Sequence, residues 1–142
     1  MANEPTARPS IRWSGVCLDC ADADQMAAFY GQLLGWEITA RDASTTRQGG
    51  SGWILMEDPE GGVALSFQAE DWYRPPTWPE APGAQDKMLH FEVGVDDLDA
   101  AIAVVVEGGG TVAAHQPHDR DQAELRVVLD PAGHPFCLIS EG

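Results

Sequence analysis

The sequence predicts an α+β fold of two tandem β-α-β-β-β modules, whose curved mixed sheets would form a shared cleft. The stretch GVCLDCADADQMAAFYGQLLG (residues 15–35) has a counterpart 75 positions later (90 minus 15), HFEVGVDDLDAAIAVVVEGGG (residues 90–110). A second match follows each copy, because DPEGGVALS begins at 58 and DPAGHPFCLIS at 130, an offset of 72 (130 minus 58). Two ordered matches at nearly one offset indicate a duplicated unit.

The first half is predicted to run as a strand, a helix and three further strands. Residues 12–20 alternate between apolar and polar side chains, which is typical of a strand. Asp22 is placed to cap a helix, with Gln25 three residues later, and Gly35 is placed to end it. Three more strands are expected, at residues 36–41, 53–57 and 63–68.

The second half repeats this order. Residues 88–95 alternate cleanly, Asp97 can cap a helix, and the glycines at 108–110 would stop it. Strands are expected at residues 111–114, 123–129 and 134–140. We therefore expect a flexible tail at residues 1–10 and a single domain at 11–142, made of module one (11–68), a linker (69–87) and module two (88–142).

The linker, AEDWYRPPTWPEAPGAQDK, matches nothing in either repeat. It is rich in proline and carries Trp72, Tyr73 and Trp78. One interpretation is a plain connection whose aromatic side chains pack onto the domain. The other is a semi-rigid flap over a binding site, because ligand pockets favour aromatic walls. Both interpretations stay open at this point.

Composition excludes several classes of partner. The chain has 8 Lys plus Arg against 23 Asp plus Glu, a formal net charge of −15. Such a surface repels phosphate backbones and anionic lipids, so neither nucleic acid nor a membrane is expected as a partner. The first ten residues have no apolar signal core, and the 3 cysteines suit reduced thiols. A cytoplasmic location is therefore expected.

The repeat also predicts where a site would lie. One offset pairs Gly15 with His90 and the other pairs Leu65 with Cys137, so these four positions should converge on the shared cleft. Glu92 shares the strand face of His90, about 7 Å further along an extended strand. An imidazole beside a carboxylate could perform acid-base chemistry. It could equally be polar lining, and we favour that reading because no nucleophile or cofactor motif accompanies the pair.

These features together resemble the vicinal oxygen chelate superfamily, which includes glyoxalase I, extradiol dioxygenases and the fosfomycin- and bleomycin-resistance proteins. The most similar group is its glyoxalase-like domain family. The resemblance rests on the paired modules and on the stretches Asp22 to Gly35, Leu34-Gly35-Trp36, Asp96-Asp97-Leu98, Arg74 to Pro79 and Asp130-Pro131-Ala132-Gly133. It implies two paired modules, often assembled as homodimers. It does not identify a reaction, because one fold hosts many chemistries.

Metal-dependent members of the superfamily carry His, Gln or Glu at the four converging positions. This chain departs from that pattern at Gly15, Leu65 and Cys137, and only His90 fits. A catalytic divalent metal needs about three protein ligands. We therefore expect neither a metal nor another cofactor, although a divalent metal is not excluded. The HxxH at 115–118 lies among polar residues and is expected to be solvated surface.

The main functional hypothesis is a binding protein with a metal-free cleft that holds a small, partly aromatic metabolite or antibiotic. The alternative is a metal-dependent lyase, isomerase or dioxygenase of the glyoxalase type. The expected ligand-binding residues combine polar groups with an aromatic lining and two closing tryptophans: His90, Glu92, Cys137, Phe67, Trp53, Trp72 and Trp78. No catalytic residue and no metal ligand is predicted.

Overall fold

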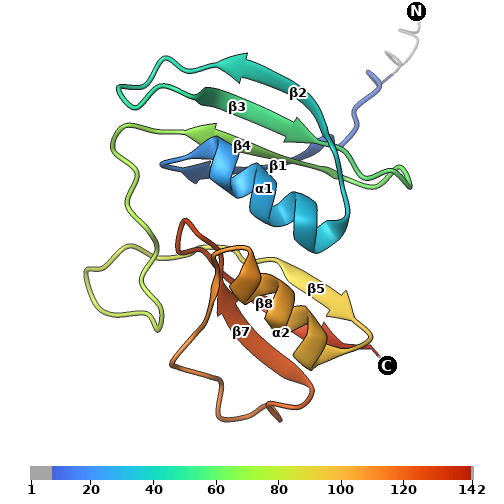
Figure 1. The fold of residues 1–142 in the computed structure, drawn as a ribbon, viewed down its shortest axis with the longest axis vertical. Coiled ribbons are helices and arrows are strands. Elements are labelled where there is room, and N and C mark those ends of the chain that lie inside the picture. The colour runs from blue at the N-terminus through green and yellow to red at the C-terminus, as the bar shows by residue number, and fades with distance from the viewer. Residues whose placement is uncertain (1–7, 142) are drawn as a thin grey trace, which may run out of the picture.

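Two four-stranded sheets, each crossed by one helix, form the fold (Figure 1). The structure is a computed structural model that describes residues 8–141. Residues 1–7 of the expected tail therefore lie outside the described part. Neither helix within residues 8–141 is long and apolar enough to cross a membrane.

The two modules have the same element order and the same strand order, so the predicted duplication is confirmed. Module one contains β1 (Gly15–Cys20), α1 (Ala23–Leu34), β2 (Ile38–Ala43), β3 (Ser51–Met56) and β4 (Ala64–Ala69). Module two contains β5 (Glu92–Val95), α2 (Leu98–Glu107), β6 (Thr111–Val112), β7 (Leu125–Leu129) and β8 (Pro135–Ser140). The sheet orders are β1-β4-β3-β2 and β5-β8-β7-β6, with β1·β4 and β5·β8 parallel.

Both predicted helix caps are present. The Asp22 carboxylate accepts a hydrogen bond from the backbone N–H of Gln25 at 3.0 Å, and Asp97 does the same for Ala100 at 3.0 Å. Gly35 ends α1 in the left-handed conformation, with φ of 72°, which costs glycine little because it has no Cβ. The local sequence therefore determines where these helices begin.

Some predicted strands are too long. The expected strand at 88–95 begins only at Glu92, because the chain turns at Met88, where φ is 62°. The Leu89 N–H donates to the Lys87 carbonyl at 2.7 Å, a three-residue γ-turn that no extended strand can contain. The first and sixth strands are also shorter than the predicted 12–20 and 111–114.

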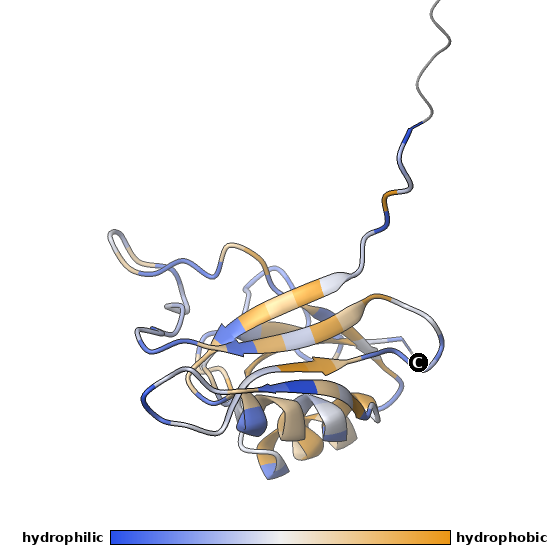
Figure 2. Cartoon of the chain, turned by 90° about the horizontal axis from the view of Figure 1, so that it is seen from above, coloured by the Kyte–Doolittle hydropathy of each residue, from blue (hydrophilic) through white to orange (hydrophobic). Residues whose placement is uncertain are grey.

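The core lies between the two sheets and the two helices, α1 and α2. Figure 2 shows the helices on one side of the strands, while the other side has no covering helix. Phe29 and Tyr30 of α1 are buried and pack edge to face with a ring-centroid distance of 4.9 Å. The side of the sheets without a helix is therefore the side on which a surface hollow can form.

The turn between β7 and β8 joins the two modules. Its Asp130 carboxylate is buried and accepts a hydrogen bond from the Tyr30 hydroxyl at 2.7 Å. The His134 Nε2 contacts the carbonyl oxygen of Asp19, on β1, at 2.7 Å. From the linker, the Tyr73 hydroxyl donates to the Ala132 carbonyl at 2.6 Å. One turn of module two thus contacts module one and the linker together.

Candidate functional site

The strand register corrects the predicted set of converging positions. In module one Cys17 pairs with Ser66, whereas in module two Glu92 pairs with Cys137. Because Glu92 is the repeat counterpart of Cys17, the counterpart of Cys137 is Ser66. The predicted pairing of Cys137 with Leu65 is therefore wrong by one residue. That shift moves a side chain to the opposite face of the sheet, and Leu65 accordingly lies in the core.

The concave face of module two holds a hollow of about 250 Å³ that collects four of the seven predicted ligand-binding residues. The His90 Nε2 lies 3.4 Å from the Glu92 Oε1. Cys137 pairs with Glu92 on the neighbouring strand β8. Trp78 reaches the same hollow from the linker. We call this the module-two hollow.

Trp78 is held at the wall of this hollow by contacts with two residues, His115 and Lys87. Its indole Nε1–H donates to the His115 carbonyl at 3.0 Å, and the two rings meet edge to face at 5.7 Å. The Lys87 ammonium lies 4.7 Å from the indole centroid. His115 is therefore half-buried support for Trp78 rather than the solvated surface that the sequence predicted. The linker therefore packs onto the domain and supplies part of the wall of this hollow. That it acts as a flap over a binding site stays a prediction.

Three charged residues of the module-two hollow were missed by sequence reasoning: Lys87, Asp119 and Arg120. Lys87 is the only lysine in the chain. It follows the proline-rich linker and precedes the turn at Met88, so no strand periodicity points to it. Its rarity in an acidic chain was the one signal that could have drawn attention to it. The apolar part of the lining is completed by Pro117, Leu125, Val127, Pro135 and Phe136.

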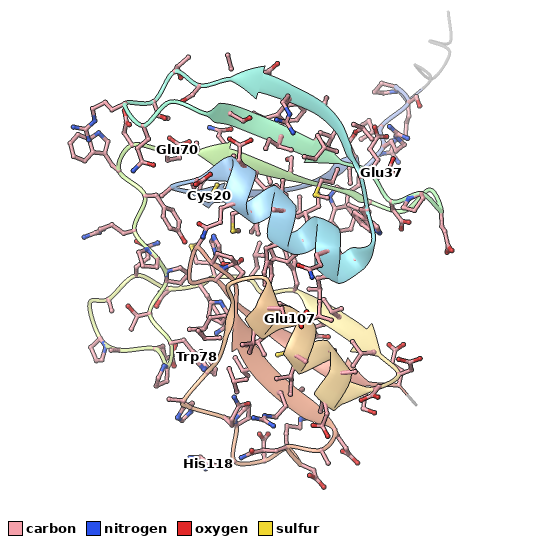
Figure 3. The ribbon with its side chains drawn as sticks, viewed as in Figure 1. Cys20, Glu37, Glu70, Trp78, Glu107 and His118 are labelled. Carbon is pink, nitrogen blue, oxygen red and sulfur yellow. The ribbon has the colours of Figure 1, made fainter. Side chains whose placement is uncertain are left out.

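The other three predicted residues do not join this hollow. Phe67 is fully buried on the helix-covered side, where its ring stacks on Tyr30 with a centroid distance of 5.5 Å. The prediction that Phe67 lines the cleft is therefore wrong, because the side chain lies on the opposite face of β4. Trp53 and Trp72 line a separate hollow on module one. Figure 3 labels Glu70, which lines that hollow at the end of β4, far from Trp78 on the linker beside module two.

The residues present do not fit a divalent metal centre. Within residues 8–141, His, Cys, Asp and Glu side chains form no group of three that could hold an ion. A Cβ added to Gly15 would lie 2.5 Å from the Ala64 carbonyl oxygen, so no side chain can be placed there without moving the backbone. Burial, together with the nearby Glu92 carboxylate, raises the pKa of the Cys137 thiol. Metal binding by cysteine requires the thiolate.

Comparison with known sequences gives matches over most of the chain. A family model described as "Glyoxalase-like domain" matches residues 15–139. Two curated relatives, each named "Putative glyoxylase CFP32", come from Mycobacterium bovis and Mycobacterium tuberculosis. Each is 29% identical over 118 residues, which cover 82% of this chain but 41% of the relative. The chain therefore spans only about two-fifths of the length of these relatives.

Solved structures share the fold at low sequence identity. A glyoxalase/bleomycin resistance protein/dioxygenase family enzyme from Burkholderia phytofirmans superposes with a TM-score of 0.62 at 19% identity, covering 92% of this chain and 98% of that one. A glyoxalase family protein from Enterococcus faecalis gives 0.60 at 21% identity, covering 88% and 94%. With the family match over residues 15–139, the chain belongs to the glyoxalase-like domain family of the vicinal oxygen chelate superfamily.

Proposed function

We propose that this protein binds a small, partly aromatic metabolite or antibiotic in the module-two hollow without a bound metal ion. The observation that carries the proposal is the grouping of His90, Glu92, Cys137 and Trp78 around one concavity. The hollow combines an indole wall and aliphatic lining with a few polar groups, which is the usual make-up of a small-molecule site.

The polar and aromatic side chains of the hollow could each contact such a ligand in a different way. The His90 imidazole and the Glu92 carboxylate contact each other at 3.4 Å and are both partly exposed, so either can also bind a ligand group. Trp78 offers an aromatic surface, and aromatic pairs contribute on the order of 1 kcal/mol beyond the area they bury. The raised pKa of Cys137 keeps its thiol protonated near neutral pH, which makes it a weak donor rather than a nucleophile.

The test is a ligand screen by saturation-transfer NMR, using a panel of small aromatic acids, amines and phenols. We expect members of the panel to bind the wild type. Trp78→Ala should weaken that binding about tenfold, because the variant removes both buried area and ring contact. Glu92→Gln, which keeps the side-chain shape and removes the charge, should change the order of preference between amines and acids.

Trp72→Ala serves as the matched control, because it removes a tryptophan from the other hollow. Panel binding that survives both Trp78→Ala and His90→Ala unchanged would rule the proposal out. The rival function is a metal-dependent lyase, isomerase or dioxygenase. The names of the relatives favour this alternative. Stoichiometric uptake of Zn²⁺, Ni²⁺ or Mn²⁺ by the wild type, lost in His90→Ala, would establish that rival instead.

A further inference from the structure

Module one carries a second hollow of about 680 Å³ on its concave face. Trp53 projects into it from β3, beside its register partner Gln68 on β4. Their strand neighbours Ile54 and Phe67 point the other way into the core, as strand alternation requires. Trp72 forms another wall from the start of the linker. This hollow, here the module-one hollow, shares no lining residue with the module-two hollow.

The charged residues that line the module-one hollow are all acidic. Its lining includes the carboxylates of Asp42, Glu70 and Asp71 and no basic side chain. The module-two hollow differs, since it is lined by Lys87 and Arg120 as well as by acidic groups. An anion entering the module-one hollow would be repelled by these carboxylates and by the net charge of −15. A cation would be attracted.

The chain already places one organic cation at the rim of this hollow. The guanidinium carbon of Arg47, from the loop between β2 and β3, lies 4.6 Å from the Trp72 ring centroid. The Arg47 Nε lies 3.6 Å from the Asp71 Oδ1, which also accepts the Arg47 backbone N–H at 2.9 Å. An indole face and a carboxylate thus hold a cation together, in the geometry of a cation–π contact.

This internal contact is one that a ligand could replace. The side chains of Arg47 and Asp71 are 67% and 30% exposed, and Trp72 is 82% exposed. Solvent-exposed ion pairs contribute about 0–1 kcal/mol, so little holds the guanidinium in place.

We propose that the module-one hollow is a second binding site, selective for an organic cation such as a quaternary ammonium, amine or guanidinium group. The cation would lie against the Trp72 indole and the Asp71 carboxylate, and Arg47 competes with it at the rim. Thr45, Thr46 and Gln68 supply hydroxyl and amide groups for the polar substituents of the guest. The site is separate from the one under Proposed function and does not depend on it.

The probe is choline, titrated into the intact chain while the tryptophan indole N–H signals are followed by NMR. Its neutral isostere, 3,3-dimethyl-1-butanol, has the same shape without the charge. We expect choline to shift indole signals other than that of Trp78, and the isostere to bind more weakly. Trp72→Ala should weaken choline binding about two- to fivefold, the range for an exposed cation–π contact.

Arg47→Ala gives the sharper test. It frees the Trp72 face and the Asp71 carboxylate, so choline should bind about two- to fivefold more tightly than to the wild type. Arg41→Ala is the matched control, because it removes the same charge from the same module. Arg41 is paired with Asp24 at 3.7 Å and does not line the hollow, so choline binding should change much less.

Three results would overturn the proposal. The first is equal binding of choline and its isostere, which would show that the hollow does not recognise the positive charge of choline. The second is equal tightening in Arg47→Ala and Arg41→Ala, which would reduce the effect to net charge. The third is loss of choline binding in Trp78→Ala with no change in Trp72→Ala, which would move the cation to the module-two hollow. None of them bears on binding of the aromatic panel.

Discussion

Asp24 shows how a single residue connects three elements of module one. From the first turn of α1, its carboxylate accepts hydrogen bonds from the Ser51 N–H at 2.9 Å and the Ser51 hydroxyl at 2.7 Å. Arg41 of β2 lies 3.7 Å away. The hydrogen bonds from Ser51, and to a lesser degree the Arg41 charge, hold the pKa of Asp24 below its usual 3.8.

This lowered pKa predicts an acid dependence with a definite sign. A carboxyl group that is more acidic in the folded chain stabilises the fold above its unfolded pKa. That stability is lost as pH falls through the folded value. Asp24→Asn should therefore lower the melting temperature at pH 7, and the difference from the wild type should shrink below pH 3.8. Calorimetry from pH 7 to pH 3 measures it; a difference constant with pH would contradict the assignment.

At the scale of elements, the two helices begin in the same way and end differently. Asp22 and Asp97 each cap a helix through a side-chain hydrogen bond to the backbone three residues later. Gly35 closes α1 at positive φ, whereas Gly108 closes α2 with φ of −79° and the reversal falls on Gly109. The starts are alike because both rest on one local contact. The ends differ because the left-handed glycine follows α1 directly but comes one residue later after α2.

Removing either cap should destabilise the protein by a similar amount. Asp22→Ala and Asp97→Ala each leave an N–H in the first helical turn without its side-chain acceptor, which costs about 1 kcal/mol. Asp22→Asn is the matched control, because asparagine caps about as well as aspartate. Urea unfolding monitored by circular dichroism gives the free energies. Equal losses in Asp22→Ala and Asp22→Asn would show that charge, rather than capping, matters.

The two modules of the molecule are joined by a buried polar pair, Tyr30 and Asp130. Tyr30 and Asp130 are 1% and 3% exposed and their side chains meet at 2.7 Å. Burial raises the pKa of Asp130, although the hydrogen bond from Tyr30 and the His134 imidazole act the other way. Two backbone N–H groups, those of Ala132 and His134, complete its hydrogen bonding. The turn is therefore held to module one at its first residue, Asp130.

Tyr30→Phe should weaken this contact by leaving the buried carboxyl short of one donor, at a cost of about 1–3 kcal/mol. Tyr73→Phe is the control, since it removes a linker hydroxyl that donates to the same turn from a half-buried position, and its cost should be smaller. Guanidinium unfolding measures both. If the modules unfold as one unit, the denaturant slope stays unchanged in both variants; a second transition in Tyr30→Phe would show that they had separated.

Much of this architecture could be predicted from local patterns. The alternation predicted for the first strand is present in the structure, where Leu18 and Cys20 are buried and Asp19 between them is exposed. The helix starts followed from Asp22 and Asp97. These features depend on residues that lie only a few positions apart in the sequence. Local patterns can therefore predict them.

The placement of the site residues depended on longer-range geometry. From Asp58 to Ser66 the chain advances 8 residues (66 minus 58), whereas from Asp130 to the equivalent Cys137 it advances 7 (137 minus 130). The extra residue reverses the face of the strand that follows, so the repeat alone gave the wrong partner for Cys137. The same reversal removed Phe67 from the predicted cleft.

The sequence by itself determined that this chain is a doubled module with capped helices and an aromatic linker. Only the tertiary structure decided which strand faces lie away from the helices, that Lys87 and His115 surround Trp78, and that Trp53 and Trp72 belong to another hollow. The physical reason is that strand register and the course of the linker are set by contacts between distant segments. A shift of one residue in register exchanges the two faces of a strand.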